Sequence, residues 1–288
     1  VIDNGFDDLA TFSDGNRVQT IDLGETSVLK NLWSSIKLGV DHIKTGPDHI
    51  LFVLVLLLPS VLVFRNGWKP TDTFMTSLWR VLKVVTMFTI AHSITFTLAG
   101  LEIVPLPSPR IVESIIAISI AAAALHNIRP IVPNQEWWLA FVFGLFHGLG
   151  FASLISGLEV SRSTQLISLL GRNIGIEIGQ VIVVLLLFPG LFLLRRTVQY
   201  RPFFVVVSVV LAVLAVAWMI ERAFEVDLST DAIVDPVFDF PRILWWVAGF
   251  TLIAFAIQRY EASNDRLLPT AGPGPATDDA DQDLETVG

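Results

Sequence analysis

The five histidines of this chain all lie within or beside strongly apolar stretches of sequence. They are His42, His49, His92, His126 and His147. An imidazole is costly to carry into a lipid bilayer, so histidines in such stretches usually mark a path for an ion or a proton. We therefore expect a membrane protein that binds a metal ion or moves protons.

His42 and His49 frame a short string in which Gly46, Pro47 and Asp48 precede the second histidine. The Gly-Pro pair breaks a helix, because proline lacks an amide N–H and restricts the residue before it. The chain can then fold back and bring His42 close to Asp48 and His49. Two imidazoles and a carboxylate are a common ligand set for a borderline divalent ion. Asp48 could instead hold a ligating imidazole through a hydrogen bond, or cap the helix that follows.

The composition indicates an integral membrane protein. The chain has 288 residues, of which 53% are hydrophobic and only 16% are charged. A soluble domain usually carries about 25% charged residues. The chain contains no cysteine, so a metal site must use nitrogen and oxygen ligands. We expect no organic cofactor. We also expect no nucleic acid partner, since basic residues do not alternate with aromatic ones.

Hydropathy and helical periodicity predict an all-α fold with seven transmembrane helices. The expected spans lie in a membrane domain at 48–258 and are 48–64, 81–101, 110–128, 137–157, 170–194, 202–222 and 242–258. They follow a polar extramembrane segment at 1–28 and an amphipathic interfacial helix with its Gly-Pro break at 29–47. Residues 259–288 are expected to form a disordered acidic tail. Lysines and arginines are commoner in the loops of one face, which places the N-terminus outside a cell (inner or plasma) membrane and the C-terminus in the cytoplasm.

Polar groups from five of the expected spans lie at similar depths, if each helical residue rises about 1.5 Å. His49 opens the first span at its outer end, and His92 and His147 lie near the centres of theirs. Because all these groups lie between the outer boundary and the midplane, we expect one shared site. Its predicted metal ligands are His42, Asp48, His49, His92, His147 and Glu177. Its predicted supporting or proton-coupling groups are Glu113, Asn173, Gln180 and Ser93.

Simpler interpretations of the same residues stay open. His147 could make a structural hydrogen bond, and Glu113, Asn173 and Glu177 could bond between helices without binding a ligand. His126 lies near the cytoplasmic end of its span, where snorkelling explains it, and we leave it out of the site. The glycines near His147 indicate close helix packing; they are Gly144, Gly148 and Gly150.

These motifs together resemble the HupE/UreJ family of membrane proteins, and more closely its second branch. The resemblance covers about residues 36–258 and is carried by the segments 39–54, 88–95, 112–113, 143–153 and 173–180. It implies a nickel or cobalt permease linked to hydrogenase or urease maturation, and it implies a role in metal passage for His42, Asp48 and His49. The chain departs from the better known branch at Ile43, where that branch has a proline, and it lacks further histidines of that branch.

Three functions are therefore considered. The first is a permease for a divalent transition-metal ion (nickel, cobalt or zinc) in the lipid bilayer, with a metalloenzyme maturation system as a candidate partner. The second is an intramembrane zinc-dependent hydrolase, in which the metal ion activates water and Ser93 or Ser153 assists. No His-Glu-x-x-His string supports this second function. The third is a binding or assembly subunit in which the metal ion only staples helices together.

Overall fold

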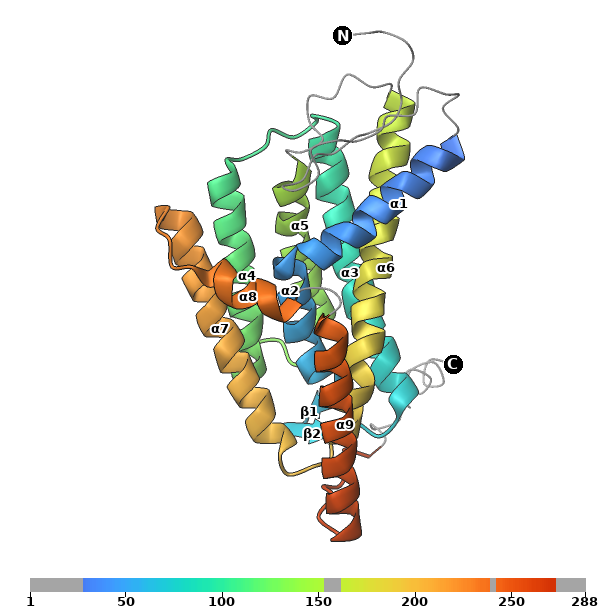
Figure 1. The fold of residues 1–288 in the computed structure, drawn as a ribbon, viewed down its shortest axis with the longest axis vertical. Coiled ribbons are helices and arrows are strands. Elements are labelled where there is room, and N and C mark those ends of the chain that lie inside the picture. Colours follow the sequence, from blue (N-terminus) through green and yellow to red (C-terminus); the bar gives the residue numbers. More distant parts are fainter. Residues whose placement is uncertain (1–27, 153–161, 239–241, 273–288) are drawn as a thin grey trace, which may run out of the picture.

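The structure, a computed structural model, describes residues 28–152, 162–238 and 242–272, and these parts are almost entirely helical (Figure 1). Ser153, the acidic residues beyond 272 and nearly all of the expected N-terminal segment lie outside the described residues. The helices are α1 (Val28–Thr45), α2 (Pro47–Leu57), α3 (Phe74–Gly100), α4 (Pro109–Ile128), α5 (Glu136–Ala152), α6 (Arg162–Leu194), α7 (Tyr200–Phe224), α8 (Thr230–Phe238) and α9 (Arg242–Ser263).

The described residues make a multi-pass membrane protein. In these ranges five helices, α3, α4, α6, α7 and α9, are long and apolar enough to cross a membrane. The pair α1–α2 makes a sixth if its two bent halves are counted as one span. The expected span at 137–157 corresponds to α5, whose described part stops at Ala152. The all-helical membrane fold is confirmed, and the count of seven spans stays a prediction.

The first expected span, at 48–64, is a shorter helix than predicted. α2 ends at Leu57, and a 3-10 turn, η1 (Leu58–Val61), leads into β1 (Leu62–Phe64). β1 pairs antiparallel with β2 (Trp68–Pro70), in the register Val63 opposite Lys69. Pro59 has no amide N–H to offer the Val55 carbonyl, which weakens the helix here. The side-chain amide of Asn127 in α4 donates to that carbonyl instead, at 2.9 Å.

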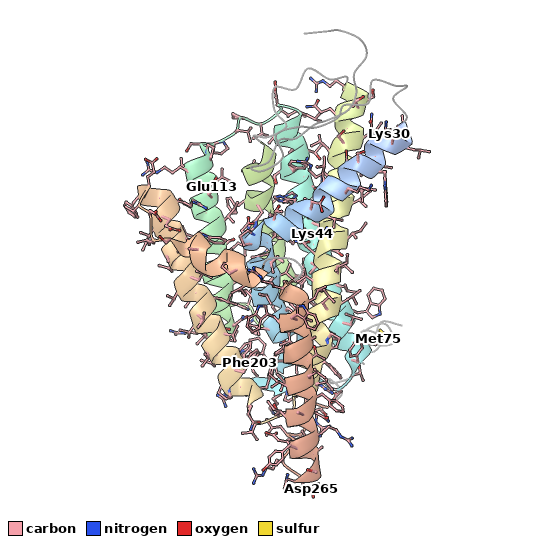
Figure 2. All side chains as sticks on the ribbon, viewed as in Figure 1. Lys30, Lys44, Met75, Glu113, Phe203 and Asp265 are labelled. Carbon is pink, nitrogen blue, oxygen red and sulfur yellow. The ribbon has the colours of Figure 1, made fainter. Side chains whose placement is uncertain are left out.

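α2 lies at the centre of the bundle, where α3, α4, α6 and α7 contact it (Figure 1). Its side chains Phe52, Val55 and Leu57 are completely buried. In Figure 2, Glu113 lies in the upper part of α4, whereas Phe203, near the start of α7, lies towards the opposite end of the bundle. The two ends are therefore distinct: α4 begins and α7 ends at one, and the β1–β2 hairpin lies at the other.

α1 packs on α6 through backbone rather than through large side chains. Its buried face carries every fourth residue: Asn31, Ser35, Gly39 and Ile43. A Cβ atom added at Gly175 of α6 would press on the Ile36 carbonyl and lie 2.8 Å from the Cα atom of Gly39. Such close approach of two helices requires glycine on both. The predicted amphipathic helix is thus present and docked on the bundle, and its interfacial depth stays a prediction.

The residues that follow α9 return to the bundle. The Leu268 N–H donates to the Arg196 carbonyl at 2.7 Å, and the Ala271 N–H donates to the Pro70 carbonyl at 2.9 Å. Residues 259–263 belong to α9 itself. The structure therefore orders the first part of the segment 259–288, which the sequence assigned to a disordered tail. The composition of this segment does not reveal that its main-chain N–H groups bond to carbonyls at the hairpin end of the bundle, and these bonds hold it in place.

We predict that Gly175→Ala lowers thermal stability, since the new methyl group has to displace backbone of α1. Overpacking of this kind costs about 1–3 kcal/mol. The measurement is the melting temperature of the purified protein in detergent. Gly249→Ala is the matched control, because nothing lies within 4 Å of a Cβ atom at this position in α9. Equal melting temperatures for the two variants would contradict the close contact of α1 with α6.

Candidate metal centre

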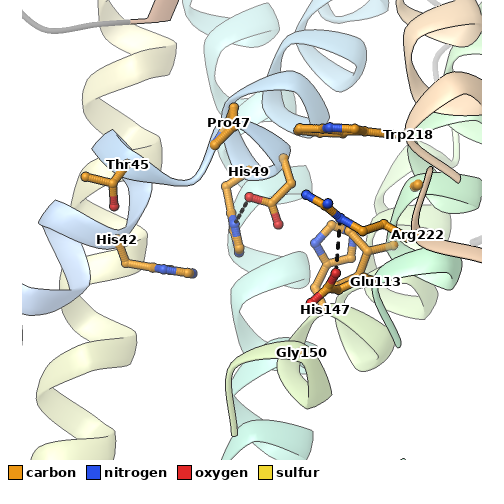
Figure 3. Close-up of a pocket in the computed structure, with 12 residues that line it drawn as sticks. His42, Thr45, Pro47, His49, Glu113, His147, Gly150, Trp218 and Arg222 are labelled. Atoms are coloured by element: carbon orange, nitrogen blue, oxygen red, sulfur yellow. Dashed lines mark hydrogen bonds and ion pairs between the residues drawn. The ribbon is translucent and has the colours of Figure 1, made fainter. Parts of the chain in front are cut away.

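The bend between α1 and α2 brings His42 and His49 together (Figure 3). The two helices are inclined by 74°, and the centres of the two imidazole rings lie 4.6 Å apart. The Gly46 N–H donates to the His42 carbonyl at 2.8 Å, which closes the turn. A Cβ atom at Gly46 would lie 2.8 Å from that carbonyl and 3.0 Å from the Asp48 carboxylate. Glycine is therefore needed for the two histidines to meet.

α2 begins in the middle of the bundle. The ring centre of His49 lies 6.0 Å from that of His92 in α3 and 5.6 Å from that of His147 in α5. The sequence places both of these residues near the centres of their spans. His49 therefore lies inside the bundle beside α3 and α5, whereas the sequence led us to expect it at the outer end of a span. A helix can break at such depth where it is buried in protein or lines a cavity.

The Asp48 carboxylate holds one nitrogen of His49. The Nδ1 atom lies 3.1 Å from Asp48 Oδ1. A carboxylate only accepts hydrogen bonds, so Nδ1 carries the proton and Nε2 keeps its lone pair. The N-cap residue of α2 is Gly46, which has no side chain to cap the helix. Asp48 is therefore not the N-cap of α2, and its carboxylate orients a buried imidazole.

Ser119 of α4 holds one nitrogen of His147. The Ser119 hydroxyl donates to the Ile116 carbonyl at 2.7 Å, so its oxygen accepts from His147 Nε2 at 2.9 Å. This arrangement leaves the lone pair on Nδ1. Ser119 was not singled out by the sequence, because it looks like any small residue of an apolar span and lies 28 positions from its partner.

Asn173 of α6 holds one nitrogen of His92. The Asn173 side-chain amide donates to the Leu169 carbonyl at 3.0 Å, which fixes which end of the amide faces α3. Its Oδ1 atom therefore accepts from His92 Nδ1, at 3.2 Å. The lone pair of His92 is left on Nε2. The sequence predicted Asn173 as a supporting group, and the structure places it against an imidazole.

The other nitrogens of these three rings are buried and have no hydrogen-bond partner: His49 Nε2, His92 Nε2 and His147 Nδ1. A buried polar atom without a partner is costly. A neutral imidazole with one N–H held by an acceptor and the other nitrogen free is the usual state of a metal-ligating histidine. In the part of the chain that the structure describes, Asp48, His49 and His147 offer ligand atoms within 4.8 Å of one another. These donors suit a divalent transition-metal ion.

A cavity of about 380 Å³ adjoins this group. His42, Asp48 and His49 line it together with His147 and, from α4 and α7, Glu113 and Arg222 (Figure 3). Arg222 Nε lies 3.1 Å from Glu113 Oε2. Glu113, predicted as a supporting or proton-coupling group, thus faces the same cavity but is paired with a cation.

Glu177, predicted as a metal ligand, lies elsewhere. Its Oε1 atom accepts from the Thr86 hydroxyl at 2.6 Å, in a groove between α3 and α6. Gln180 likewise accepts from Thr89 at 3.0 Å, and the Ser93 hydroxyl donates to its own helix, at the Thr89 carbonyl. Depth along a helix gives the height of a residue but not the neighbour it faces. At the height of Glu177 the facing residue of α3 is a threonine, so the structure does not bring this carboxylate to the histidines.

The glycines around His147 bring α5 against its neighbours. A Cβ atom at Gly144 or Gly148 would press on the backbone of α3 at Phe88 and His92, and one at Gly150 would lie 2.9 Å from a methyl group of Ile116. His147 is thereby held between α3 and α4. His126 is remote from this group, since its Nδ1 atom accepts from the Ile131 N–H at the end of α4, at 3.0 Å.

A family model described as HupE / UreJ protein matches residues 19–222. The chain belongs to the HupE/UreJ family. The match runs from before α1 to Arg222 near the end of α7, so it includes every residue of the metal centre described above. No curated protein and no solved structure matches the chain. The resemblance first noted in the histidine motifs is thus confirmed at the level of the family.

We predict that Ser119→Ala weakens metal binding by this HupE/UreJ protein about 10–100-fold, as loss of a group that orients a ligating histidine commonly does. The His147 ring then loses the acceptor that fixes its tautomer. Isothermal titration of the purified protein with Ni²⁺ or Co²⁺ measures the change. Ser93→Ala serves as the control, because that hydroxyl donates to the backbone of its own helix, in the groove beside Glu177. Equal affinities for both variants would refute the assignment of His147 Nδ1 as a ligand.

Proposed function

We propose that this protein is a permease for a divalent transition-metal ion, with nickel or cobalt as the cargo and zinc as a third candidate. The family is generally linked to nickel and cobalt transport. The observation that carries the proposal is the group of buried imidazoles on α2, α3 and α5, each with one nitrogen held by an oxygen atom and the other without a hydrogen-bond partner. An acidic side chain, Asp48, lies in the same group.

The position of this group favours passage over permanent storage. Transporters commonly bind their cargo near the midplane, at a helix that is broken there. α1 and α2 form such a broken crossing, and the ion would exchange water for His42, Asp48 and His49 on entering the cavity. It would then reach His147 and His92. A site of mixed nitrogen and oxygen ligands releases a divalent ion more readily than a closed thiolate cage, and conduction requires release.

We place the β1–β2 end of the bundle in the cytoplasm of a cell (inner or plasma) membrane. Arginines gather there and bond to main-chain groups of the same end: Arg65 to Ala271, Arg80 to Leu62, Arg195 to Thr71 and Arg196 to Leu268. Cytoplasmic ends of membrane proteins carry an excess of such residues. With this orientation the N-terminus is outside, and the cavity is reached from outside between α4 and α7. A metalloenzyme maturation system on the cytoplasmic side is the candidate recipient.

Two carboxylic acids are candidates for carrying protons during transport. Glu113 lines the cavity itself, whereas Glu177 lies in the groove between α3 and α6 and has a buried oxygen, Oε2, without a hydrogen-bond partner. A carboxyl group inside the bilayer is costly when ionised, so reversible protonation of either residue would couple metal transport to the movement of protons. Three polar residues lie between α3 and α6 near Glu177. The groove is also lined by Ser93 and Asn173, and Gln180 bonds to Thr89 of α3.

The test is uptake of Ni²⁺ or Co²⁺ into sealed vesicles that hold the purified protein and a metal-sensitive dye. We predict that His49→Ala abolishes uptake, because the imidazole at the centre of the group is lost. His126→Gln is the matched control: it removes a histidine outside the site and keeps a hydrogen-bond acceptor for the end of α4. Its uptake should equal that of the parent protein.

Other outcomes would overturn the proposal. Stoichiometric metal binding without flux would make the protein a binding or assembly subunit whose metal ion staples helices. Metal-dependent turnover of a lipid or peptide, lost in His49→Ala, would make it an intramembrane hydrolase.

A further inference from the structure

The Glu113–Arg222 ion pair stands between two cavities. Both side chains line the metal-centre cavity, and both also line a second cavity of about 400 Å³. We call the second cavity the outer vestibule; it is lined by Arg110, Glu113, Glu221, Arg222, Glu225 and Asp227. Figure 3 shows Arg222 reaching from α7 towards Glu113, between Trp218 and His147. The pair therefore lies where the two cavities adjoin.

The frame of the outer vestibule is held without this pair. Arg110 Nε donates to the Ala223 carbonyl at 2.8 Å, and its guanidinium pairs with Glu225 at 3.2 Å. Glu221 accepts from the Leu228 N–H at 2.8 Å and from the Thr230 N–H at 3.2 Å, which orders the loop after α7. The Glu113–Arg222 pair can thus separate while the end of α7 and its loop keep their hydrogen bonds.

The pair is partly exposed to solvent. The side chains of Arg222 and Glu113 are 40% and 48% exposed. An ion pair this exposed contributes little stability, because water competes for both partners. The vestibule that faces it carries three further carboxylates, on Glu221, Glu225 and Asp227. With Glu113 these make four carboxylates against two guanidinium groups, on Arg110 and Arg222, so the vestibule carries a net negative charge, which raises the local concentration of cations.

We propose that the Glu113–Arg222 pair is the gate between the outer vestibule and the metal centre. A divalent cation collected by the vestibule competes with the Arg222 guanidinium for the Glu113 carboxylate, and its arrival there frees Arg222 to move aside. A cation that binds carboxylate weakly leaves the pair closed. The identity of the cargo rests on the proposed function, but the opening of the gate is measurable without any metal ion.

The absence of cysteine from the chain allows a direct test. Ala117 lines the metal-centre cavity but not the outer vestibule, and it is buried. Ala117→Cys places one thiol behind the gate. A membrane-impermeant, positively charged methanethiosulfonate reagent, added on the vestibule side of sealed vesicles, then reports access. We expect slow modification in the parent background and several-fold faster modification when Arg222→Gln or Glu113→Gln breaks the pair.

Two controls make the result specific. Arg110→Gln removes the neighbouring Arg110–Glu225 pair and one positive charge of the vestibule, so it measures the effect of charge alone and should raise the rate less than Arg222→Gln does. The exchanged pair Glu113→Arg with Arg222→Glu should restore slow modification. Ile116→Cys, on the same cavity wall, is the second reporter if the first variant does not fold. The gate proposal is wrong if the rate of thiol modification is the same in all backgrounds, or if Arg110→Gln raises this rate as much as Arg222→Gln does.

Metal uptake measured on the same vesicles separates this inference from the proposed function. If metal uptake persists but the rate of thiol modification does not depend on the ion pair, the gate proposal is refuted and the permease proposal stands. If the rate of thiol modification depends on the ion pair but the vesicles take up no metal ion, the permease proposal is refuted and the gate proposal stands.

Discussion

The break at Gly46-Pro47 is the constraint on which the rest of the structure depends. A helix that stops inside a bilayer leaves main-chain groups that water cannot reach, and each must find a partner in the protein. Here the Gly46 N–H donates to the His42 carbonyl, and the His49 N–H donates to the Gly46 carbonyl at 3.2 Å. Before this turn, α1 is held against α6 by backbone contacts at Gly39 and Gly175. Without that close packing the two halves of the crossing could not place His42 over His49 at mid-bundle.

The histidine group shows how neighbouring imidazoles can share a small volume. If the rings were charged, their repulsion at these distances would be large in a medium of low polarity. Each of three rings is instead held at one nitrogen by an oxygen acceptor: a carboxylate for His49, an amide for His92 and a hydroxyl for His147. Three different chemical groups on three different helices thus each hold one nitrogen of a ring, and the other nitrogen of each ring is buried without a hydrogen-bond partner. The common result, rather than any one bond, indicates a ligand site.

Much of this arrangement could be predicted from the sequence, and the exceptions have physical causes. The meeting of His42 with His49 follows from the Gly-Pro break, and the approach of His92 and His147 follows from their depth. Glu177 was misplaced because depth does not specify which neighbouring helix a side chain faces. Ser119 and Asn127 were missed because their partners lie 28 and 72 positions away along the chain, beyond any periodic signal. The early end of α2 was missed because the apolar residues of η1 and β1 look like a continuation of the helix.

The mid-bundle start of α2 also has an electrical consequence. If about half of the transmembrane voltage falls between the outside and this depth, a doubly charged ion that reaches the site from outside gains about 2.3 kcal/mol per 100 mV of inside-negative potential. Occupancy of the site would then rise with polarisation of the membrane before any ion has crossed. An energised cell could thus fill the site at external concentrations too low to fill it in a depolarised one.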